Sequence, residues 1–165
     1  MREREVAMIR GIHHPAITTG DMDRLLPFYR DHLGFTEIFA FGWESGTEMS
    51  NFAAGITGIS NSTARSVLLK AGNAFLELFE YKQPQSSRND DRSLSQQGFA
   101  HVCFDSDDVI ADHERLLTAG VPFISAPVDV GPMRICYCRD PDGNFVELQQ
   151  ITDPASDLVL RALQS

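Results

Sequence analysis

Apolar residues along the chain recur with two spacings, and each spacing predicts one kind of element. Alternating apolar residues predict strands, whereas apolar residues three or four apart predict helices. For the first half we expect a strand over 9–19, a helix over 24–33, a strand over 35–43 and a hairpin of 64–70 with 74–81. Pro27 lies inside the expected helix, so the hydrogen-bonded part either begins near Asp23 or the helix kinks.

The second half repeats the order of the first. We expect a strand over 98–105, a helix over 109–119 capped by Asp107 and Asp108, a short strand over 121–124 and a hairpin of 133–139 with 144–151. The sequence Gly-Phe-Ala-His ending at His101 matches Gly-Ile-His-His ending at His14, and the Glu-Leu pair at Glu147 echoes the pair at Glu77. The repeat predicts an α+β fold made of two βαβββ modules.

The two modules are expected to form one domain over residues 1–165. Module one covers about 9–81 and module two about 98–151. The polar run over about 82–97 is a candidate linker, with a substrate lid as the alternative. Residues 44–63 interrupt the repeat as a long connection that could hold one short helix. The tail, 152–165, could be a short helix that packs on the core or at a subunit contact.

Charge and composition limit the class of protein. A formal net charge of -9 argues against nucleic acid and anionic membranes as partners. No apolar run approaches the roughly 20 residues that span a bilayer, and the first residues lack the apolar core of a signal peptide. The cysteines number 3, an odd count that favours reduced thiols and a cytoplasmic location, with Cys136 and Cys138 as core residues. We therefore expect a cytoplasmic protein that acts on a small molecule.

Two glutamates lie in strands where their neighbours are apolar. Burying a carboxylate without a partner costs several kcal/mol, so Glu77 and Glu147 each need water, a partner or a metal. The repeat places His14 and His101 at equivalent points of the first strand of each module. Because strand side chains alternate, only one of the adjacent histidines can point inward, and the register selects His14 rather than His13.

The repeat thus predicts a site of two imidazoles and two carboxylates. Such a set suits one divalent ion such as Zn, Ni, Co, Fe or Mn, and the two negative charges balance the ion. A purely structural hydrogen-bond network is the alternative. The predicted metal ligands are His14, Glu77, His101 and Glu147.

Five segments together carry a family resemblance: Ile12–Ile17, Phe28–Phe35, Phe75–Leu78, Gly98–Val102 and Asp140–Glu147. In these segments the chain resembles the vicinal oxygen chelate superfamily, which includes glyoxalase I, methylmalonyl-CoA epimerase, extradiol dioxygenases and bleomycin-resistance proteins. The resemblance implies a curved mixed sheet that wraps a metal, with the same four ligands. Members are often homodimers, and the site could lie within one chain or be shared between two.

The complete ligand set favours a glyoxalase- or epimerase-like enzyme, a lyase or isomerase. In such an enzyme the metal chelates two substrate oxygens, and Glu147 or Glu77 moves a proton at the adjacent carbon. An Fe(II) extradiol-type dioxygenase that uses His14, His101 and Glu147 is one alternative. A metal-free, bleomycin-resistance-like binding protein is another. Compact glyoxalase I sequences usually have a shorter connection where this chain has residues 44–63. This difference argues against a glutathione hemithioacetal as substrate.

Overall fold

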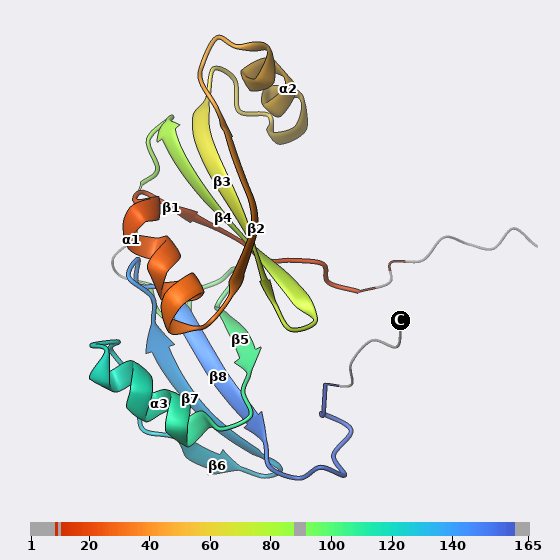
Figure 1. Ribbon diagram of the computed structural model, residues 1–165, viewed down its shortest axis with the longest axis vertical. Helices are drawn as coiled ribbons and strands as arrows, with labels where there is room; N and C mark the ends of the chain where they lie inside the picture. The colour runs from red at the N-terminus through yellow and green to blue at the C-terminus, as the bar shows by residue number, and fades with distance from the viewer. Residues whose placement is uncertain (1–8, 10, 88–91, 161–165) are drawn as a thin grey trace, which may run out of the picture.

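The structure is a computed structural model that describes residues 9, 11–87 and 92–160 (Figure 1). Module one forms a four-stranded sheet with the order β1-β4-β3-β2. Strand β1 is parallel to β4, and the other pairs are antiparallel. Its elements are β1 (Ala16–Thr19), α1 (Met22–Pro27), the π-helix η1 (Phe28–His32), β2 (Thr36–Trp43), α2 (Glu48–Thr57), β3 (Thr63–Ala71) and β4 (Ala74–Gln83).

Module two forms a second four-stranded sheet with the equivalent order, β5-β8-β7-β6. Strand β5 is parallel to β8, and the other pairs are antiparallel. The predicted α+β fold of two βαβββ modules is confirmed, with two mixed sheets that each take all their strands from one half of the chain. The elements of module two are β5 (His101–Asp105), α3 (Val109–Thr118), β6 (Val128–Val130), β7 (Met133–Arg139) and β8 (Phe145–Ile151).

Some expected elements differ from those observed. The first strand is only Ala16–Thr19, so the chain reaches it through an extended lead that holds the two histidines. Residues 121–124 form a single bridge, Phe123 to Cys138, and the outer strand of the second sheet is β6 instead. The helix expected over the tail is absent from 152–160, and 161–165 lie outside the described residues. The long connection over 44–63 does hold one helix, α2, which Thr47 caps.

Pro27 marks a change in helical form. The α-helix begins at Met22, where Asp21 accepts a hydrogen bond from the Arg24 N–H, and Pro27 is its last residue. Proline has no N–H to donate to the Asp23 carbonyl, so the regular α-helical hydrogen bonding stops there. From Phe28 the chain continues as a π-helix, in which the Leu33 N–H donates to the Phe28 carbonyl over 3.0 Å. The helix thus begins early, as the first alternative requires, and its α-helical form ends at the proline.

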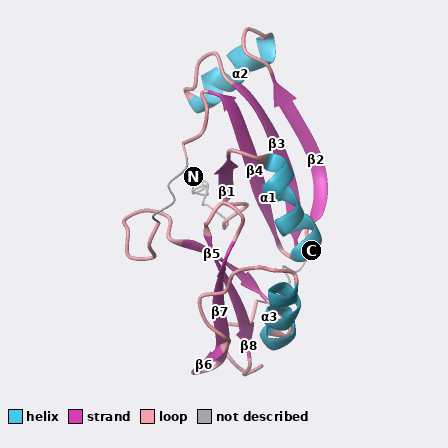
Figure 2. Cartoon of the chain, turned by 90° about the vertical axis from the view of Figure 1, so that its left-hand side faces the viewer, coloured by secondary structure: helices cyan, strands magenta, loops and turns pink. Residues whose placement is uncertain are grey.

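Helices α1 and α3 lie on the same side of the two sheets (Figures 1 and 2). One apolar core joins them to the faces that they cover, and it contains residues of both modules. Leu76 and Leu78 on β4 and Val146 and Leu148 on β8 are buried in this core. Because side chains alternate along a strand, Glu77 and Glu147 point to the opposite side, which we call the open face of each sheet.

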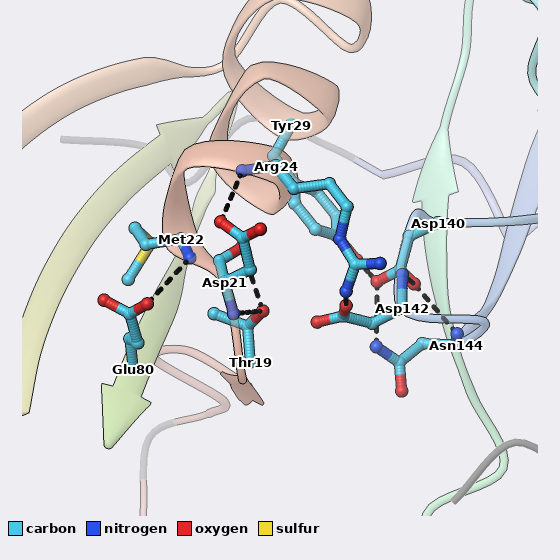
Figure 3. A network of polar contacts seen from close by, with 9 residues as sticks. All are labelled: Thr19, Asp21, Met22, Arg24, Tyr29, Glu80, Asp140, Asp142 and Asn144. Carbon is cyan, nitrogen blue, oxygen red and sulfur yellow. Dashed lines mark hydrogen bonds and ion pairs between the residues drawn. The ribbon is translucent and has the colours of Figure 1, made fainter. Parts of the chain in front are cut away.

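A buried polar link joins the modules at the turn before β8 (Figure 3). The Tyr29 hydroxyl, from η1, donates to Asp140 Oδ2 over 2.8 Å. Asp140 also accepts hydrogen bonds from the Asp142 N–H and from the backbone and side chain of Asn144. Arg24 on α1 forms an ion pair with Asp142 in the same turn. Burial raises the pKa of Asp140, while the donors from Asn144 and Tyr29 act in the opposite direction.

We expect Tyr29→Phe to destabilise the protein by about 1 to 3 kcal/mol, the usual cost of losing a hydrogen bond to a buried charged group. Urea unfolding should show a lower midpoint with an unchanged slope. Tyr81→Phe is the matched control, because the Tyr81 hydroxyl makes no hydrogen bond within the described part of the chain. Equal midpoints for the two variants would show that the link contributes nothing to stability.

Candidate functional site

The first histidine–glutamate pair lies where β1 meets β4. Ala16 is the parallel partner of Glu77, and His14 lies two residues before Ala16. His14 Nε2 is 3.3 Å from Glu77 Oε2. The other carboxylate oxygen, Oε1, accepts a hydrogen bond of 2.8 Å from the Ser66 hydroxyl on β3. Ser66 therefore holds Glu77 from the side that faces away from the histidine.

The second pair has the same register in module two. Cys103 is the parallel partner of Glu147, and His101 lies two residues before Cys103. His101 Nε2 is 2.9 Å from Glu147 Oε2. The Tyr137 hydroxyl on β7 donates to the same oxygen over 2.8 Å. Burial, and then the bond to Glu147, raise the pKa of Tyr137 to about 12, so its hydroxyl remains a donor.

The surroundings of the two carboxylates differ in degree. The Glu147 side chain is 10% exposed, whereas the Glu77 side chain is 16% exposed. Both histidine side chains are about one-third open to solvent, at 35% for His14 and 33% for His101. Each pair thus combines a held carboxylate with an accessible imidazole, an arrangement in which both side chains can bind a ligand from the open face.

Within a single chain the four predicted ligands form two separate pairs. Among the described residues, no group of three or more His, Cys, Asp or Glu side chains lies close enough together to bind a metal ion. Each pair offers one nitrogen and one oxygen ligand, which is half of the donor set that a transition metal takes from a protein. The structure therefore brings together His14 with Glu77 and His101 with Glu147, but it does not bring the two pairs together.

The structure places His13 differently from the prediction. Alternation would turn its side chain away, but residues 11–15 precede the strand and alternation does not apply to them. The His13 ring stacks on Phe75, and its Nδ1 lies 2.8 Å from Nδ1 of His14. His32 and His113 lie at the helices as predicted, away from both pairs, and His113 packs against Phe123.

The three cysteines behave as expected for reduced thiols. Cys136 and Cys138 are buried in the core, as predicted, and burial raises the pKa of Cys136 to about 11 and that of Cys138 to about 12. Cys103 is exposed on the open face of the second sheet, beside Glu147. It therefore lines the surface around the second pair rather than the core.

Three arginines on the hairpins have partners within the chain. Arg65 contacts Glu80 over 2.6 Å and Asp23 over 2.8 Å, on the face that α1 covers. Arg134 pairs with Asp129 over 2.7 Å across the outer hairpin. The Arg139 guanidinium lies 3.9 Å from the centre of the Phe145 ring and donates to the Gly143 carbonyl.

Sequence analysis alone did not identify Ser66 and Tyr137. Tyr137 lies directly opposite Glu147 in the hairpin. Counting residues outward from the turn at 140–143 would therefore have identified Tyr137 as the neighbour of Glu147. Ser66 is harder to find, because Leu68, not Ser66, lies directly opposite Glu77 and the serine reaches it diagonally.

Comparison with known proteins defines the class. The sequence profile of the Glyoxalase/Bleomycin resistance protein/Dioxygenase superfamily matches residues 11–148. The chain therefore belongs to this superfamily, and the resemblance seen in its motifs is confirmed. None of the described helices is long and apolar enough to cross a membrane.

Several proteins named as glyoxalases are similar to this chain in sequence or in fold. The lactoylglutathione lyase of Pseudomonas aeruginosa is 29% identical over 143 residues, which cover 84% of this chain and 81% of that protein. A glyoxalase family protein from Bacillus cereus shares the fold with a TM-score of 0.77 at 17% identity, covering 90% of this chain and 98% of that one. The trypanothione-dependent glyoxalase I of Leishmania major has a TM-score of 0.62 at 21% identity, covering 86% and 87%.

Proposed function

We propose that the protein is a metal-dependent enzyme of the glyoxalase or epimerase type, a lyase or isomerase. It binds two neighbouring oxygens of a small molecule and moves a proton at the adjacent carbon. The observation that carries this proposal is the equivalent placement of two histidine–glutamate pairs on the open faces of the two modules. Similarity to a lactoylglutathione lyase supports the same class of reaction.

The metal ligands in this proposal are His14, Glu77, His101 and Glu147. Their chemistry suits the ion, because two imidazole nitrogens and two carboxylate oxygens are ligands that Zn, Ni, Co, Fe and Mn all accept. Ser66 and Tyr137 act behind the glutamates, where each hydroxyl fixes the orientation of one carboxylate. When bound, the metal would polarise the substrate oxygens and stabilise the negative charge that develops on them.

The proton is carried by a glutamate of the chain. A general base must reach the proton directly, and the carboxylates of Glu77 and Glu147 can still accept a proton when the two imidazoles of the pairs bind the metal. Glu147 is the more buried of the two, and its charge is held by Tyr137 and His101 on one oxygen. This arrangement fixes the carboxylate close to where the substrate carbon lies, so that proton transfer needs little rearrangement.

The complete site forms between two copies of the chain in this proposal. The pair His14–Glu77 of one copy faces the pair His101–Glu147 of the other, and a two-fold axis then creates two identical sites. Support comes from the separation of the pairs within one chain and from the open faces on which they lie. The substrate would bind between the two open faces, where the accessible imidazoles meet.

A mixed dimer distinguishes this shared site from a site within one chain. One variant carries His14→Ala and Glu77→Gln, and the other carries His101→Ala and Glu147→Gln. Neither alone should bind a metal at the site. After unfolding and refolding together, half of the dimers are mixed and each has one intact site, so about one quarter of the wild-type metal content should return.

Metal content by elemental analysis is the readout, and turnover should recover in proportion. The control is each variant unfolded and refolded by itself. It should regain no metal, whether the site is shared between chains or lies within one chain. Recovery no greater than in this control would show that the pairs of one chain serve the same site.

Glu147→Gln tests the proton carrier. Glutamine keeps the shape and an oxygen ligand but cannot accept the proton, so turnover should fall by about 10²- to 10⁴-fold. The assay follows exchange of the substrate C–H for deuterium by NMR in heavy water, over a panel of 2-hydroxyacyl compounds. Glu114→Gln, a change at an exposed glutamate on α3, is the control. Full activity of Glu147→Gln would remove Glu147 from this role, and activity that consumes O₂ would indicate a dioxygenase.

Tyr137→Phe tests the support behind Glu147. Losing a hydrogen bond to a metal ligand commonly lowers metal affinity by about 10- to 100-fold, and we expect a decrease in this range. Competition with a chromophoric chelator measures the affinity for Zn(II). Tyr81→Phe should leave that affinity unchanged, since no hydrogen bond of its hydroxyl supports either glutamate within the described residues. Equal affinity in the two variants would contradict the assigned role.

A further inference from the structure

The open face of the first sheet carries a continuous strip of aromatic side chains. Neighbouring ring centres along this strip are 5.9 to 6.3 Å apart. It follows β2, crosses the sheet at the end where α2 lies and returns along β4 (Figure 1). We call these residues the aromatic strip: Phe39, Phe41, Trp43, Phe79 and Tyr81.

Small residues on the central strand lie between the two arms of the strip. Ser66 has Phe41 on one side and Phe79 on the other, and Ala64 lies between Trp43 and Tyr81 in the same way. At one end, Ala53 of α2 packs with Trp43 and Ala64 and covers them. At the other end, Ser66 donates its hydrogen bond to Glu77. The surface enclosed by the strip therefore leads directly to the first histidine–glutamate pair.

Two rings of the strip, both on β2, are open to solvent despite their apolar character. Phe39 is 49% exposed and Phe41 is 43% exposed, and these side chains lie beside each other on one strand. Contiguous apolar surface of this kind marks a binding site more often than isolated exposed residues do. An apolar partner that covers the two rings would remove this area from water.

The charge of the surface limits what that partner can be. Phe41, Ser66, Phe79 and Thr18 form one row across the sheet, and none of them carries a charge. Arg65, next to Ser66 along the strand, points to the covered face and is held by Glu80 and Asp23. On the open face Glu77 borders this row, and the exposed Lys70 lies beyond Leu68 at the far end of β3. An anionic group over Phe41 and Phe79 would therefore lie near the Glu77 carboxylate, without a basic partner in that row.

The distance across the sheet limits the size of the partner. Phe39, Leu68 and Glu77 lie in one row on β2, β3 and β4. Two strand spacings of about 4.8 Å separate the outer members by about 10 Å. A molecule with its oxygens beside Glu77 must therefore extend across most of this distance to contact Phe39, which is about the reach of a phenyl ring with its linking carbon.

Building on the proposed function, we propose that the aromatic strip binds an uncharged aromatic or branched aliphatic group of the substrate. The substrate class is then a small aryl or alkyl compound with two neighbouring oxygens, and not one that is joined to a large anionic carrier. The rings of Phe39 and Phe41 supply the contact area, and the small side chains of Ser66 and Ala64 leave room for the group.

Fluorescence provides a direct test, because Trp43 is the sole tryptophan of the chain and belongs to the strip. Benzohydroxamic acid carries two neighbouring oxygens on a phenyl ring, and acetohydroxamic acid carries the same oxygens on a methyl group. Each is titrated into the Zn(II)-loaded protein while Trp43 emission is recorded. We expect the phenyl compound to bind at least about tenfold more tightly, as expected when an apolar group of this size is buried.

Variants test whether the aromatic strip causes the tighter binding of the phenyl compound. Phe41→Ala should reduce the difference between the two compounds to less than about threefold, and Phe41→Leu should retain part of it. Leu117→Ala, which removes an exposed apolar side chain from α3, should leave it unchanged. Thermal unfolding of each variant shows whether the fold is kept.

A test compound that does not chelate a metal distinguishes this inference from the proposed function. Benzamide, which cannot chelate through two oxygens, should still quench Trp43 in metal-free protein, although it binds more weakly. If metal loading fails but benzamide binds and Phe41→Ala abolishes that binding, the aromatic site holds and the metal proposal does not. Equal affinity of the wild-type protein for the two hydroxamic acids would overturn the inference, as would tighter binding of 4-carboxybenzohydroxamic acid.

Discussion

The parallel register between the first and last strand of each module positions every residue of the candidate site. In module one it sets Ala16 opposite Glu77, and in module two it sets Cys103 opposite Glu147. A histidine two residues earlier then lies beside each carboxylate. A shift of one residue would turn each glutamate into the apolar core, where an unpaired charge costs several kcal/mol. The buried leucines and valines on either side of each glutamate therefore help to fix the site as well as the fold.

The same alternation explains why the site faces away from the helices. Helices α1 and α3 cover one side of the two sheets, and their shared core holds the modules together. The turn at Asp140 connects the helical layer to the site. Asp140 accepts the hydrogen bond of Tyr29 from the helical layer, and the turn leads directly into β8, the strand of Glu147. The opposite faces keep their aromatic and ionisable side chains accessible, which leaves them available for a metal, a substrate or a second chain.

Much of this arrangement can be predicted from the sequence, because it depends on local spacing. The alternation around Glu77 and Glu147 and the offset between His14 and His101 both appear in the observed registers. The helix expected within 44–63 is present as α2 and includes most of the short apolar segment there. The orientation of His13 was predicted wrongly, because the first strand is shorter than its apolar pattern suggests and its stacking partner, Phe75, is distant in sequence.

The separation of the two histidine–glutamate pairs within one chain could not be predicted from the sequence. It depends on how the helices pack the modules together, through contacts such as Tyr29 with Asp140 that join residues far apart in the chain. The repeat shows that the pairs are equivalent, but equivalence is compatible both with a site in one chain and with a shared one. Ser66 was missed for a different reason, since it reaches Glu77 diagonally while Leu68 is the residue directly opposite Glu77.

The central claim is that one metal ion is bound by both pairs together. X-ray absorption spectroscopy of the Zn(II)-loaded protein tests it most directly, because scattering within imidazole rings counts the histidines bound to the ion. The account predicts one ion per chain with two imidazoles and the remaining ligands oxygen, and one imidazole after His101→Ala. An ion with a single imidazole in the wild-type protein, or two ions per chain, would show that the pairs act separately and would contradict the account.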